Sequence, residues 1–572
     1  MKKIILLISI LLPSFIGTKA QNALGAYGVS QPDLKGTARF MGMAGAFGAL
    51  GGDLSAISVN PGGIGVYRSS DIGFTLDLDA QKSTSQVQGS SYDMSQTKFL
   101  LNNIGAVLTL RLASNAVPNL NFGFTYNKGA SFNRVLGGDI PNLGNSMSNY
   151  VAGIANTLGV TEGDVSWDSG VDPYNPGLDY FQAPWMTILS YDSYLINPDF
   201  DPSTGETRWS GLWMSDKDSM SGTSTKGSGS FLLQEWGSTN DYNIVIGGNI
   251  ANIVYWGMNF DIVNMNYQLN TVWGERLTNA VVPNGNSYAY GNADWKFNSL
   301  YTMSATGFNY QLGFIVKPVQ QFRLGFAFHT PTWYNINEEF SGSINYDLGD
   351  QSGQRITNDG YPGYTSYNFR TPWKIIASAA GVLGDKLIVS FDYEWANYGS
   401  MHFSQPRYYD DYYYGYDPWD PWPYAAQPAS YLDYINSSDP YGVENAQIST
   451  YYKSSNTYRI GVEFKPISAL SIRAGYSNVS SPVKYEAQNN QIEIATGSLT
   501  PSYRFDNSTN YITCGLGFRY QHVYVDLAYV YKHMSSEYHA FSPDTYKGAL
   551  PSPQAKLSLV NNQVVLSAGY RF

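Results

Sequence analysis

The stretch that decides the fold is the end of the chain, Val564-Val565-Leu566-Ser567-Ala568-Gly569-Tyr570-Arg571-Phe572. Apolar and aromatic side chains occupy every second position, and Ser567, Gly569 and Arg571 fall between them. A period of two predicts a β-strand. A face that carries Arg571 cannot meet lipid at low cost, whereas a face that ends in aromatic residues suits the interface of a membrane-spanning barrel. A terminal aromatic residue also resembles the signal by which outer-membrane barrels are recognised for assembly.

The same alternation recurs upstream in segments of about nine to eleven residues, the length that a tilted strand needs to cross a bilayer. Together with the last strand they number fourteen, an even number as in single-chain bacterial barrels. The segments before the last strand are 71–79, 103–111, 119–127, 241–250, 252–264, 307–316, 321–329, 373–382, 386–395, 457–464, 470–477, 510–520 and 522–532. The sequence therefore predicts an all-β fold, a 14-stranded antiparallel transmembrane β-barrel over residues 71–572.

The predicted connections alternate between tight links and long ones. Tight links lie at 317–320, 383–385, 465–468 and 520–521. The long ones cover roughly residues 128–240, 267–306, 330–372, 396–456, 478–509 and 533–562. Short periplasmic turns and long extracellular loops are typical of this architecture, so both chain ends are expected on the periplasmic side. A two-domain soluble sandwich also contains alternating strands, but it would not separate short from long links in this way.

Composition and the first twenty residues agree with an exported barrel. Lys2 and Lys3 precede an apolar run, and Thr18-Lys19-Ala20 offers a small-residue cleavage site, which predicts a signal peptide over residues 1–20. Gln21 follows the cut in place of a cysteine, which argues against a lipidated N-terminus. Charged residues are 14% and aromatic residues 15% of the chain, with 57 Gly and 47 Tyr. No later apolar run reaches the length of a transmembrane helix.

Charge and cysteine content exclude further classes. Removal of the signal takes away three lysines and no acids, so the net charge moves from −11 to −14, and nucleic acid is not an expected partner. Cys514 is the single cysteine and cannot form an intramolecular disulfide. A closed barrel stabilises an exported chain differently, because its backbone groups are paired between strands.

Residues 21–70 precede the first strand and do not alternate. They are rich in glycine and small apolar residues and predict a compact plug with short helical turns. A dinucleotide-binding loop is a poor interpretation, because no strand precedes the glycines. The segment resembles the N-terminal hatch of the FadL family of outer-membrane transporters for long-chain fatty acids and other hydrophobic compounds, among them aromatic hydrocarbons. The residues that carry the resemblance are Gly36, Ala38, Arg39, Gly45, Ala46, Asp53, Ser55, Asn60 and Pro61.

In that family the hatch ends in an Asn-Pro-Ala motif, and this sequence has Gly62 at the alanine position. The motif residues that we single out are Asp53, Asn60, Pro61 and Gly62. Proline fixes φ, and an asparagine before it caps neighbouring backbone groups, so an Asn-Pro turn can lead the chain from the plug to the first strand.

The resemblance implies passive transport of a hydrophobic molecule that is captured among the loops, enters an apolar pocket above the hatch and leaves when the hatch shifts. The candidate ligand-binding residues are Phe40, Met41, Met43, Phe47 and Leu50. The alternative is that these side chains only pack the plug. No cofactor is expected.

Four arginines fall on inward faces near the periplasmic ends of their strands: Arg323, Arg473, Arg519 and Arg571. Buried cations need partners. Asp53 from the hatch and Glu463 from the wall are candidates, which predicts an ionic latch between barrel and hatch. Pairing between wall residues is the alternative.

Other patterns give weaker signals. The stretch Tyr408–Tyr424 combines tyrosine, tryptophan, proline and aspartate, but its spacing matches no known cation loop, and we interpret it as an adhesive surface loop. The five histidines show no metal-ligand spacing, and none lies in a nucleophile motif, so we expect neither a metal site nor an enzyme. A hydrolase assembled across strands would escape this test.

Two rival functions stay open: a general diffusion porin, and a receptor for haem or another hydrophobic ligand without transport. The expected location is the bacterial outer membrane. The expected partners are a hydrophobic small molecule, membrane lipid and the barrel assembly machinery, and we expect a monomer.

Overall fold

The computed structural model describes residues 23–31, 33–176, 181–201, 206–214, 224–285, 287–384, 386–406, 441–488, 499–542 and 552–572. The predicted signal peptide and the stretch Tyr408–Tyr424 lie outside these residues. Within the described ranges, no helix has both the length and the hydropathy of a membrane-spanning helix.

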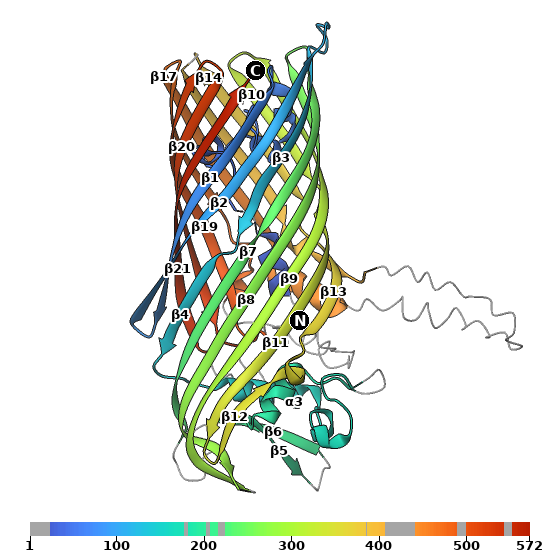
Figure 1. Ribbon diagram of the computed structural model, residues 1–572, viewed down its shortest axis with the longest axis vertical. Helices are drawn as coiled ribbons and strands as arrows, with labels where there is room; N and C mark the ends of the chain where they lie inside the picture. Colours follow the sequence, from blue (N-terminus) through green and yellow to red (C-terminus); the bar gives the residue numbers. More distant parts are fainter. Residues whose placement is uncertain are drawn as a thin grey trace, which may run out of the picture.

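The described residues form one closed antiparallel barrel with fourteen wall positions, as predicted (Figure 1). The ring closes because β1 (Asp71–Val87) pairs with both β2 (Ser90–Arg111) and β21 (Gln554–Arg571). Several wall positions consist of consecutive shorter strands. The remaining wall strands are β3 (Asn119–Ser131) with β4 (Arg134–Ile140), β7 (Lys226–Ile250), β8 (Val254–Asn284), β9 (Ser287–Val319), β10 (Phe322–His329) with β11 (Trp333–Leu348), β12 (Gln351–Ile356) with β13 (Gly363–Arg370) and β14 (Lys374–Leu383), β15 (Leu387–Asn397) with β16 (His402–Ser404), β17 (Ser454–Ile467), β18 (Leu470–Val479), β19 (Tyr503–Tyr520) and β20 (Val523–His539).

We call the end of the barrel that carries Ser70 and Phe572 the base, and the opposite end the mouth. The amides of Ser70 and Phe572 each donate to the carbonyl of the other residue at 3.0 Å, so the first and last strands end together. The predicted tight links all lie at the base, and the one between β9 and β10, predicted at 317–320, turns at Gln320 and Gln321. Strand parity in the sequence therefore predicted the connectivity correctly.

The strands are much longer than predicted toward the mouth. β8 has 31 residues and β9 has 33, about three times the roughly 9–11 residues that cross a bilayer. The predicted long loop 267–306 is therefore wrong, because these residues form a hairpin that turns near Gly285. The predicted loop 330–372 is likewise mainly strand, β11 to β13. Polar residues on both faces weaken the period-two signal there, although backbone pairing continues.

An apolar belt surrounds the outside of the barrel. Phe74, Phe124, Ile244, Phe326 and Leu516 alternate with buried neighbours and each exposes more than a third of its side chain. On the mouth side of this belt, four tyrosine hydroxyls each donate to an asparagine of the neighbouring strand at 2.6–2.9 Å. The pairs are Tyr126–Asn240, Tyr393–Asn456, Tyr476–Asn510 and Tyr529–Asn562. Aromatic girdles of this kind mark the interface of a bilayer.

A small lobe covers the mouth. It contains α3 (Met147–Leu158), α4 (Trp185–Asp192) and the hairpin of β5 (Ile196–Asp201) and β6 (Glu206–Gly211), and lies at the lower end of Figure 1. Glu275 of β8 fixes the start of α3, since its carboxylate accepts hydrogen bonds from the Ser146 hydroxyl at 2.6 Å and the Met147 amide at 2.8 Å. Negative charge at a helix N-terminus is favourable. The other short elements are η4 (Glu162–Asp164), η5 (Trp167–Ser169), η6 (Thr357–Gly360), η7 (Tyr398–Ser400), α6 (Gly442–Tyr451) and α7 (Tyr485–Gln488).

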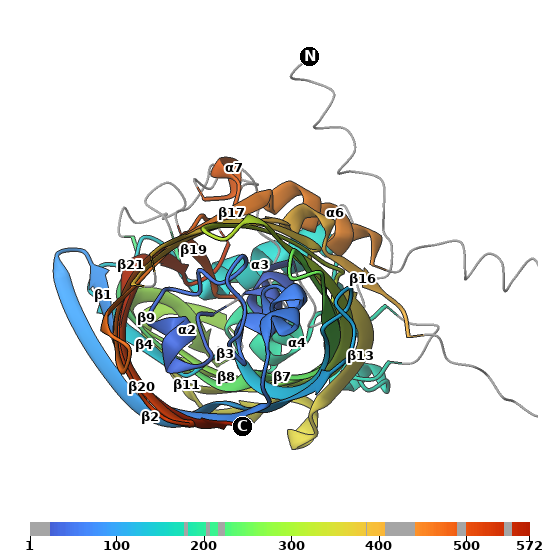
Figure 2. The same cartoon turned by 90° about the horizontal axis from the view of Figure 1, so that it is seen from above.

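The N-terminal segment, residues 23–70, lies inside the ring of strands (Figure 2). It contains α1 (Ala23–Ser30), α2 (Ala38–Met41), η2 (Ala56–Ser58) and η3 (Pro61–Val66). The Thr37 hydroxyl caps α2 by accepting from the Phe40 amide. Asn60 caps η3 by accepting from the Gly62 amide, and Pro61 takes the first helical position, where its missing N–H costs nothing. These caps explain why such short, glycine-rich turns form.

Candidate functional site

The lumen is divided into levels along the barrel axis, and residues 33–70, the part of the N-terminal segment that follows α1, fill the level nearest the base. Its η3 helix contacts β7, β8 and β9, and α2 contacts β19, β20 and β21 on the other side. The buried side chains of the segment form two apolar clusters with the wall, one around Phe47 and one around Ile64. The segment thus spans the lumen from one side of the barrel to the other.

Inward-facing glycines of the wall allow this close approach. A Cβ atom at Gly257 of β8 would lie 2.0 Å from the Pro61 carbonyl oxygen, and one at Gly313 of β9 would lie 2.0 Å from Asn60 Oδ1. At Gly325 of β10 it would lie 2.1 Å from the Gly48 carbonyl oxygen. Backbone therefore packs directly on backbone across three neighbouring wall strands. Sequence analysis missed this role, although glycines on the inward face of predicted strands were a usable signal.

Buried ion pairs join the segment to the wall on its remaining sides. Lys35 Nζ lies 2.8 Å from Asp77 and 3.0 Å from Asp79 of β1, with no exposed surface on the lysine side chain. Asp33 pairs with Lys532 of β20 at 2.9 Å, and Arg39 with Glu463 of β17 at 3.1 Å. Each pair connects residues far apart in sequence, so these contacts form only when the segment is inside the closed barrel.

The environment of Asp33 and Lys35 keeps these two side chains charged. Burial alone would raise the pKa of the Asp33 carboxyl, but Lys532 and Lys35 outweigh burial and lower that pKa to about 2. Burial alone would lower the pKa of Lys35, but Asp79 and Asp77 outweigh it and raise the pKa above its ordinary value.

The four predicted latch arginines lie near the base, and two of them bind the N-terminal segment directly. Arg323 donates to the Leu50 carbonyl at 2.9 Å, and Arg571 donates to the Gly52 carbonyl at 3.1 Å while pairing with Asp71 of the wall. Arg473 pairs with two wall acids, Glu463 at 2.7 Å and Asp526 at 2.5 Å. Arg519 lines the same charged cavity as Arg473 and Arg571 but forms no ion pair among the described residues.

The predicted acid of the latch has a different role. Among the described residues, Asp53 forms no ion pair, and its carboxylate accepts from the Thr37 hydroxyl at 2.8 Å and the Ser55 amide at 2.9 Å. These bonds join two turns within the segment. The side chain of the segment that pairs with the wall acid Glu463 is instead Arg39, which sequence analysis noted only as part of the family resemblance.

The other motif residues connect the segment to the wall. The Asn60 amide donates to the Gly48 carbonyl at 2.6 Å and to the Phe314 carbonyl of β9 at 3.1 Å. At Gly62 a Cβ atom would lie 2.9 Å from the Gly313 carbonyl oxygen, so the alanine usual in the FadL family would crowd this wall. Pro61 lies against Gly257. Asn60, Pro61 and Gly62 therefore form the contact with β8 and β9.

The predicted ligand-binding residues are placed together in one buried cluster. Phe40, Met41, Met43, Phe47 and Leu50 expose at most 5% of their surface and pack on the wall and on one another. Of the five, Phe40 also lines a cavity. Direct ligand contact stays a prediction for this set.

An apolar cavity of about 160 Å³ lies on the mouth side of residues 33–70. Helix α1 forms one side of it, with Leu24, Tyr27 and Gly28. Five apolar wall residues line much of the rest: Phe132, Leu233, Met265, Leu269 and Met303. The lining also contains charged side chains, which pair with one another: Arg504 lies 2.9 Å from Asp506 and 3.4 Å from Glu235. Sequence analysis did not identify these residues, because they come from five separate wall strands and α1.

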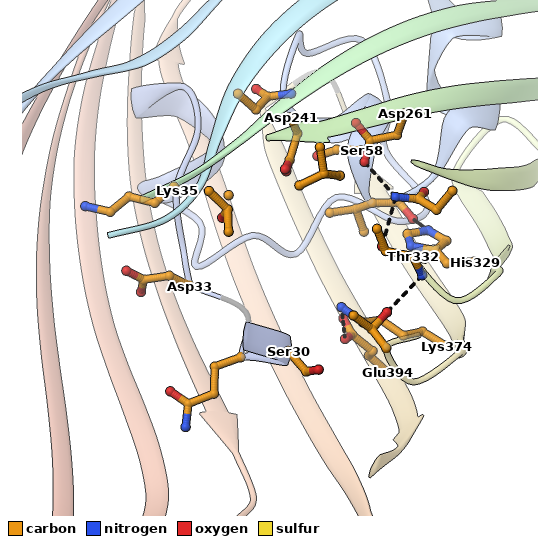
Figure 3. Close-up of a pocket in the computed structure, with 18 of the residues that line it drawn as sticks. Ser30, Asp33, Lys35, Ser58, Asp241, Asp261, His329, Thr332, Lys374 and Glu394 are labelled. Carbon is orange, nitrogen blue, oxygen red and sulfur yellow. Dashed lines mark hydrogen bonds and ion pairs between the residues drawn. The ribbon is translucent and has the colours of Figure 1, made fainter. Parts of the chain in front are cut away.

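A polar cavity of about 230 Å³ lies between the apolar cavity and the base level. Figure 3 shows Asp33 and Lys35 on one side of it, and His329, Lys374 and Glu394 on the other. His329 Nε2 lies 3.0 Å from the Val59 carbonyl oxygen, and Glu394 pairs with Arg459 at 2.7 Å. Val29 and Gln31 line both cavities, so the end of α1 and the residue after it separate them.

The described residues contain no group of three or more histidine, cysteine, aspartate or glutamate side chains arranged to bind a metal ion. His539, one of the histidines noted in the sequence, is buried and stacks on Tyr503 with the ring centroids 4.6 Å apart. The aromatic and acidic stretch Tyr408–Tyr424 lies outside the described residues.

Comparison with models of known protein families finds no match, and no curated protein matches the sequence. Among solved structures, the chain is similar to a Pseudomonas aeruginosa FadL homologue, with 12% identity, a TM-score of 0.49, and coverage of 95% of this chain and 99% of that one. It is also similar to the Pseudomonas putida toluene transporter TodX, with 12% identity, a TM-score of 0.45, and coverage of 94% and 99%. For the Ralstonia pickettii toluene transporter TbuX the values are 12%, 0.44, 94% and 98%.

Proposed function

We propose that this chain is an outer-membrane channel that passes hydrophobic small molecules, with residues 21–70 as a hatch inside the barrel of residues 71–572. The observation that carries the proposal is the apolar cavity of about 160 Å³ enclosed in a barrel whose base is filled by a packed segment. Water and ions bind weakly in an apolar cavity. An apolar ligand binds there favourably, because its transfer out of water lowers the free energy.

The outer surface supports the proposed location. The belt of exposed apolar side chains around the barrel has tyrosines on its mouth side, and Phe518, Tyr520, Tyr570 and Phe572 lie exposed at the base. Aromatic residues at both edges of an apolar band are typical of barrels in the bacterial outer membrane. The mouth would then face the exterior, and the strand extensions and the small lobe would lie outside the bilayer.

The size of the apolar cavity favours a small ligand. About 160 Å³ is close to the roughly 150 Å³ of an engineered apolar cavity that binds benzene. Of the two classes implied by the sequence resemblance, we therefore propose aromatic hydrocarbons as the first to test. A long acyl chain would need α1 to move, because α1 lies between this cavity and the polar one.

The filled base distinguishes this channel from a general diffusion porin. Backbone contacts at Gly257, Gly313 and Gly325 and buried ion pairs connect the N-terminal segment to the wall all round the lumen. A porin conducts ions steadily, so the unmodified chain in a planar bilayer should show no large stable conductance. A steady porin-like conductance would contradict the proposal.

The decisive experiment fills the apolar cavity. Gly28 lies on α1 and lines this cavity, and a Cβ atom there would meet no atom within 4 Å, so Gly28→Phe places a ring in the open space without a clash at its base. Cells that display the chain in their outer membrane would be assayed for uptake of labelled toluene and labelled oleate. We expect toluene uptake to fall at least fivefold.

Gly381→Phe is the matched control. Gly381 is a β14 glycine whose Cβ position is equally open, but it lines neither cavity. We expect uptake by this variant to equal that of the unmodified chain. Equal toluene uptake by Gly28→Phe and Gly381→Phe, at matched surface amounts, would refute the role of the cavity.

A further inference from the structure

Two carboxylates that face the polar cavity have no ion-pair partner. Asp241 of β7 and Asp261 of β8 both line this cavity, and neither forms a salt bridge among the described residues. The other two carboxylates of its lining are paired, Asp33 with Lys532 and Glu394 with Arg459. The cavity is therefore lined by two carboxyl groups on adjacent strands that have no ion-pair partner among the described residues.

The cations closest to these carboxylates are engaged elsewhere. Lys374 lies 3.9 Å from Glu394. The ammonium of Lys128, which also lines the cavity, bonds to Asn240 Oδ1 at 2.8 Å and to the Ser238 hydroxyl at 3.3 Å. Neither lysine therefore occupies the space between Asp241 and Asp261.

The wall places the two carboxylates side by side. β7 and β8 are adjacent strands, in which Asn243 is opposite Asp261 and Asp241 is opposite Val263, so the two aspartates are diagonal neighbours on the inner face. Asp261 is 4% exposed. Its Oδ2 accepts from the Asn309 amide at 2.9 Å, while its Oδ1 has no hydrogen-bond partner. A buried carboxylate oxygen without a donor is costly, and this one is available to a cation.

A glycine allows the second carboxylate to pack directly against the neighbouring strand β3. A Cβ atom at Gly129 of β3 would lie 2.9 Å from both carboxylate oxygens of Asp241 and 2.5 Å from the Thr239 hydroxyl oxygen. Any larger residue at position 129 would close this side of the site. The side chains that offer oxygen here are the two carboxylates and the Thr239 hydroxyl.

We propose that Asp241 and Asp261 form a calcium site in the wall of the polar cavity. Two carboxylates match the charge of a divalent cation, and Ca²⁺ accepts six to eight oxygen ligands in irregular geometry, water included. The cavity of about 230 Å³ has room for several waters in addition to the ion, since each water takes roughly 30 Å³. The ion would balance the negative charge of Asp241 and Asp261 in the polar cavity. The site does not depend on the proposed transport function, because ion binding is measured without any hydrophobic ligand.

The test is calcium titration of the full chain in detergent after removal of metal by a chelator. Isothermal titration calorimetry would measure Ca²⁺ binding to the unmodified chain, to Asp241→Asn, to Asp261→Asn and to the double variant. Tb³⁺ luminescence gives a second measurement, because Tyr334 lines the same cavity and can transfer energy to a bound lanthanide. Asp294→Asn is the control, since Asp294 is an exposed carboxylate paired with Arg276 at 3.0 Å.

We expect one saturable Ca²⁺ per chain, unchanged in Asp294→Asn, at least tenfold weaker in each single variant and absent in the double variant. If the double variant fails to fold, the single variants decide. Single variants that bind as tightly as the unmodified chain would overturn the proposal, as would an unmodified chain that binds no Ca²⁺. Binding of hexylammonium without binding of Ca²⁺ would also overturn it and assign the site to an organic amine.

Discussion

The lumen at the level of residues 33–70 differs from the lumen at the level of the apolar cavity, although the same strands form both. Near the base, β8 and β9 present Gly257 and Gly313 to the backbone of the segment. Further along the same strands toward the mouth, Met265 and Met303 project into the barrel and leave a cavity between them and α1. One wall thus changes from close packing to open apolar space within a few residues.

This difference in packing indicates that the base level fixes the position of the N-terminal segment and that the cavity level accommodates a ligand. Backbone contact, capped turns and buried ion pairs near the base fix a single position of the segment, because each depends on a specific distance. Flexible methionines and aromatic rings around the cavity impose no such geometry and suit a ligand defined only by its apolar surface. Substitutions near the base should therefore change stability, and substitutions around the cavity should mainly change ligand preference.

The largest loss of stability is expected from Lys35→Met. This substitution leaves Asp77 and Asp79 buried without their cation, and removal of one partner from a buried ion pair typically costs about 3–5 kcal/mol. We expect a loss of this size in the free energy of unfolding, measured by denaturant titration in detergent. The triple variant Lys35→Met, Asp77→Asn, Asp79→Asn removes all three charges and should recover most of the loss. A triple variant as unstable as the single one would mean that the lysine acts through packing and not through its charge.

Gly313→Val should destabilise the base level less than Lys35→Met does. The new side chain begins 2.0 Å from Asn60 Oδ1 and 2.8 Å from the Gly62 amide nitrogen, so the N-terminal segment must move away from β9. Overpacking of this kind costs about 1–3 kcal/mol, although valine itself favours strands. We expect a comparable loss of stability and the appearance of ion conductance in planar bilayers. Gly381→Val supplies the control, and a sealed, fully stable Gly313→Val barrel would show that the segment does not depend on this contact.

The barrel could be predicted from the sequence because its signal is repeated in every strand. Period-two alternation between Val564 and Phe572, and the parity of short and long links, are local patterns that no distant contact overrides. The extensions of β8 and β9 toward the mouth were missed, because apolar and polar residues alternate clearly only where one face of a strand contacts lipid. Where both faces meet water or other protein, as near Asn270 and Asn298, strand pairing continues without that pattern.

The candidate site was predicted only in part, because it is assembled across strands. Asn60 and Pro61 were identified from a local motif, and their contact with β8 and β9 follows from the cap that they form. The partner of Lys35, in contrast, depends on barrel closure, which brings residue 35 beside Asp77, Asp79 and Gln563. No spacing in the sequence encodes that distance, and the lining of the apolar cavity escaped prediction for the same reason.

Acid should lower the free energy of unfolding by a smaller amount, because it protonates Asp33. Its carboxyl has a pKa of about 2 in the folded chain against the ordinary 3.8, so protons bind the unfolded chain more strongly. The resulting stabilisation, roughly 2 kcal/mol, is fully present above about pH 4 and is lost as the pH falls toward 2. Denaturant titrations at pH 5 and pH 2.5 should show this loss in the unmodified chain and a smaller one in Asp33→Asn. An equal loss in both would assign the acid sensitivity to other carboxyls.

The smallest loss of stability is expected from Leu269→Ala, on the wall of the apolar cavity. Leu269 is half-buried and already faces open space, so its truncation removes few contacts and should cost about 1 kcal/mol. Ile64→Ala is the counterpart near the base, where the side chain is fully buried against the wall, and should cost about 2–5 kcal/mol.

Leu269→Ala should also widen the cavity and raise the uptake of naphthalene relative to toluene, whereas Ile64→Ala should leave this ratio unchanged. Equal losses of stability, or a ratio that changes only in Ile64→Ala, would remove the distinction between a packed base and an adaptable cavity.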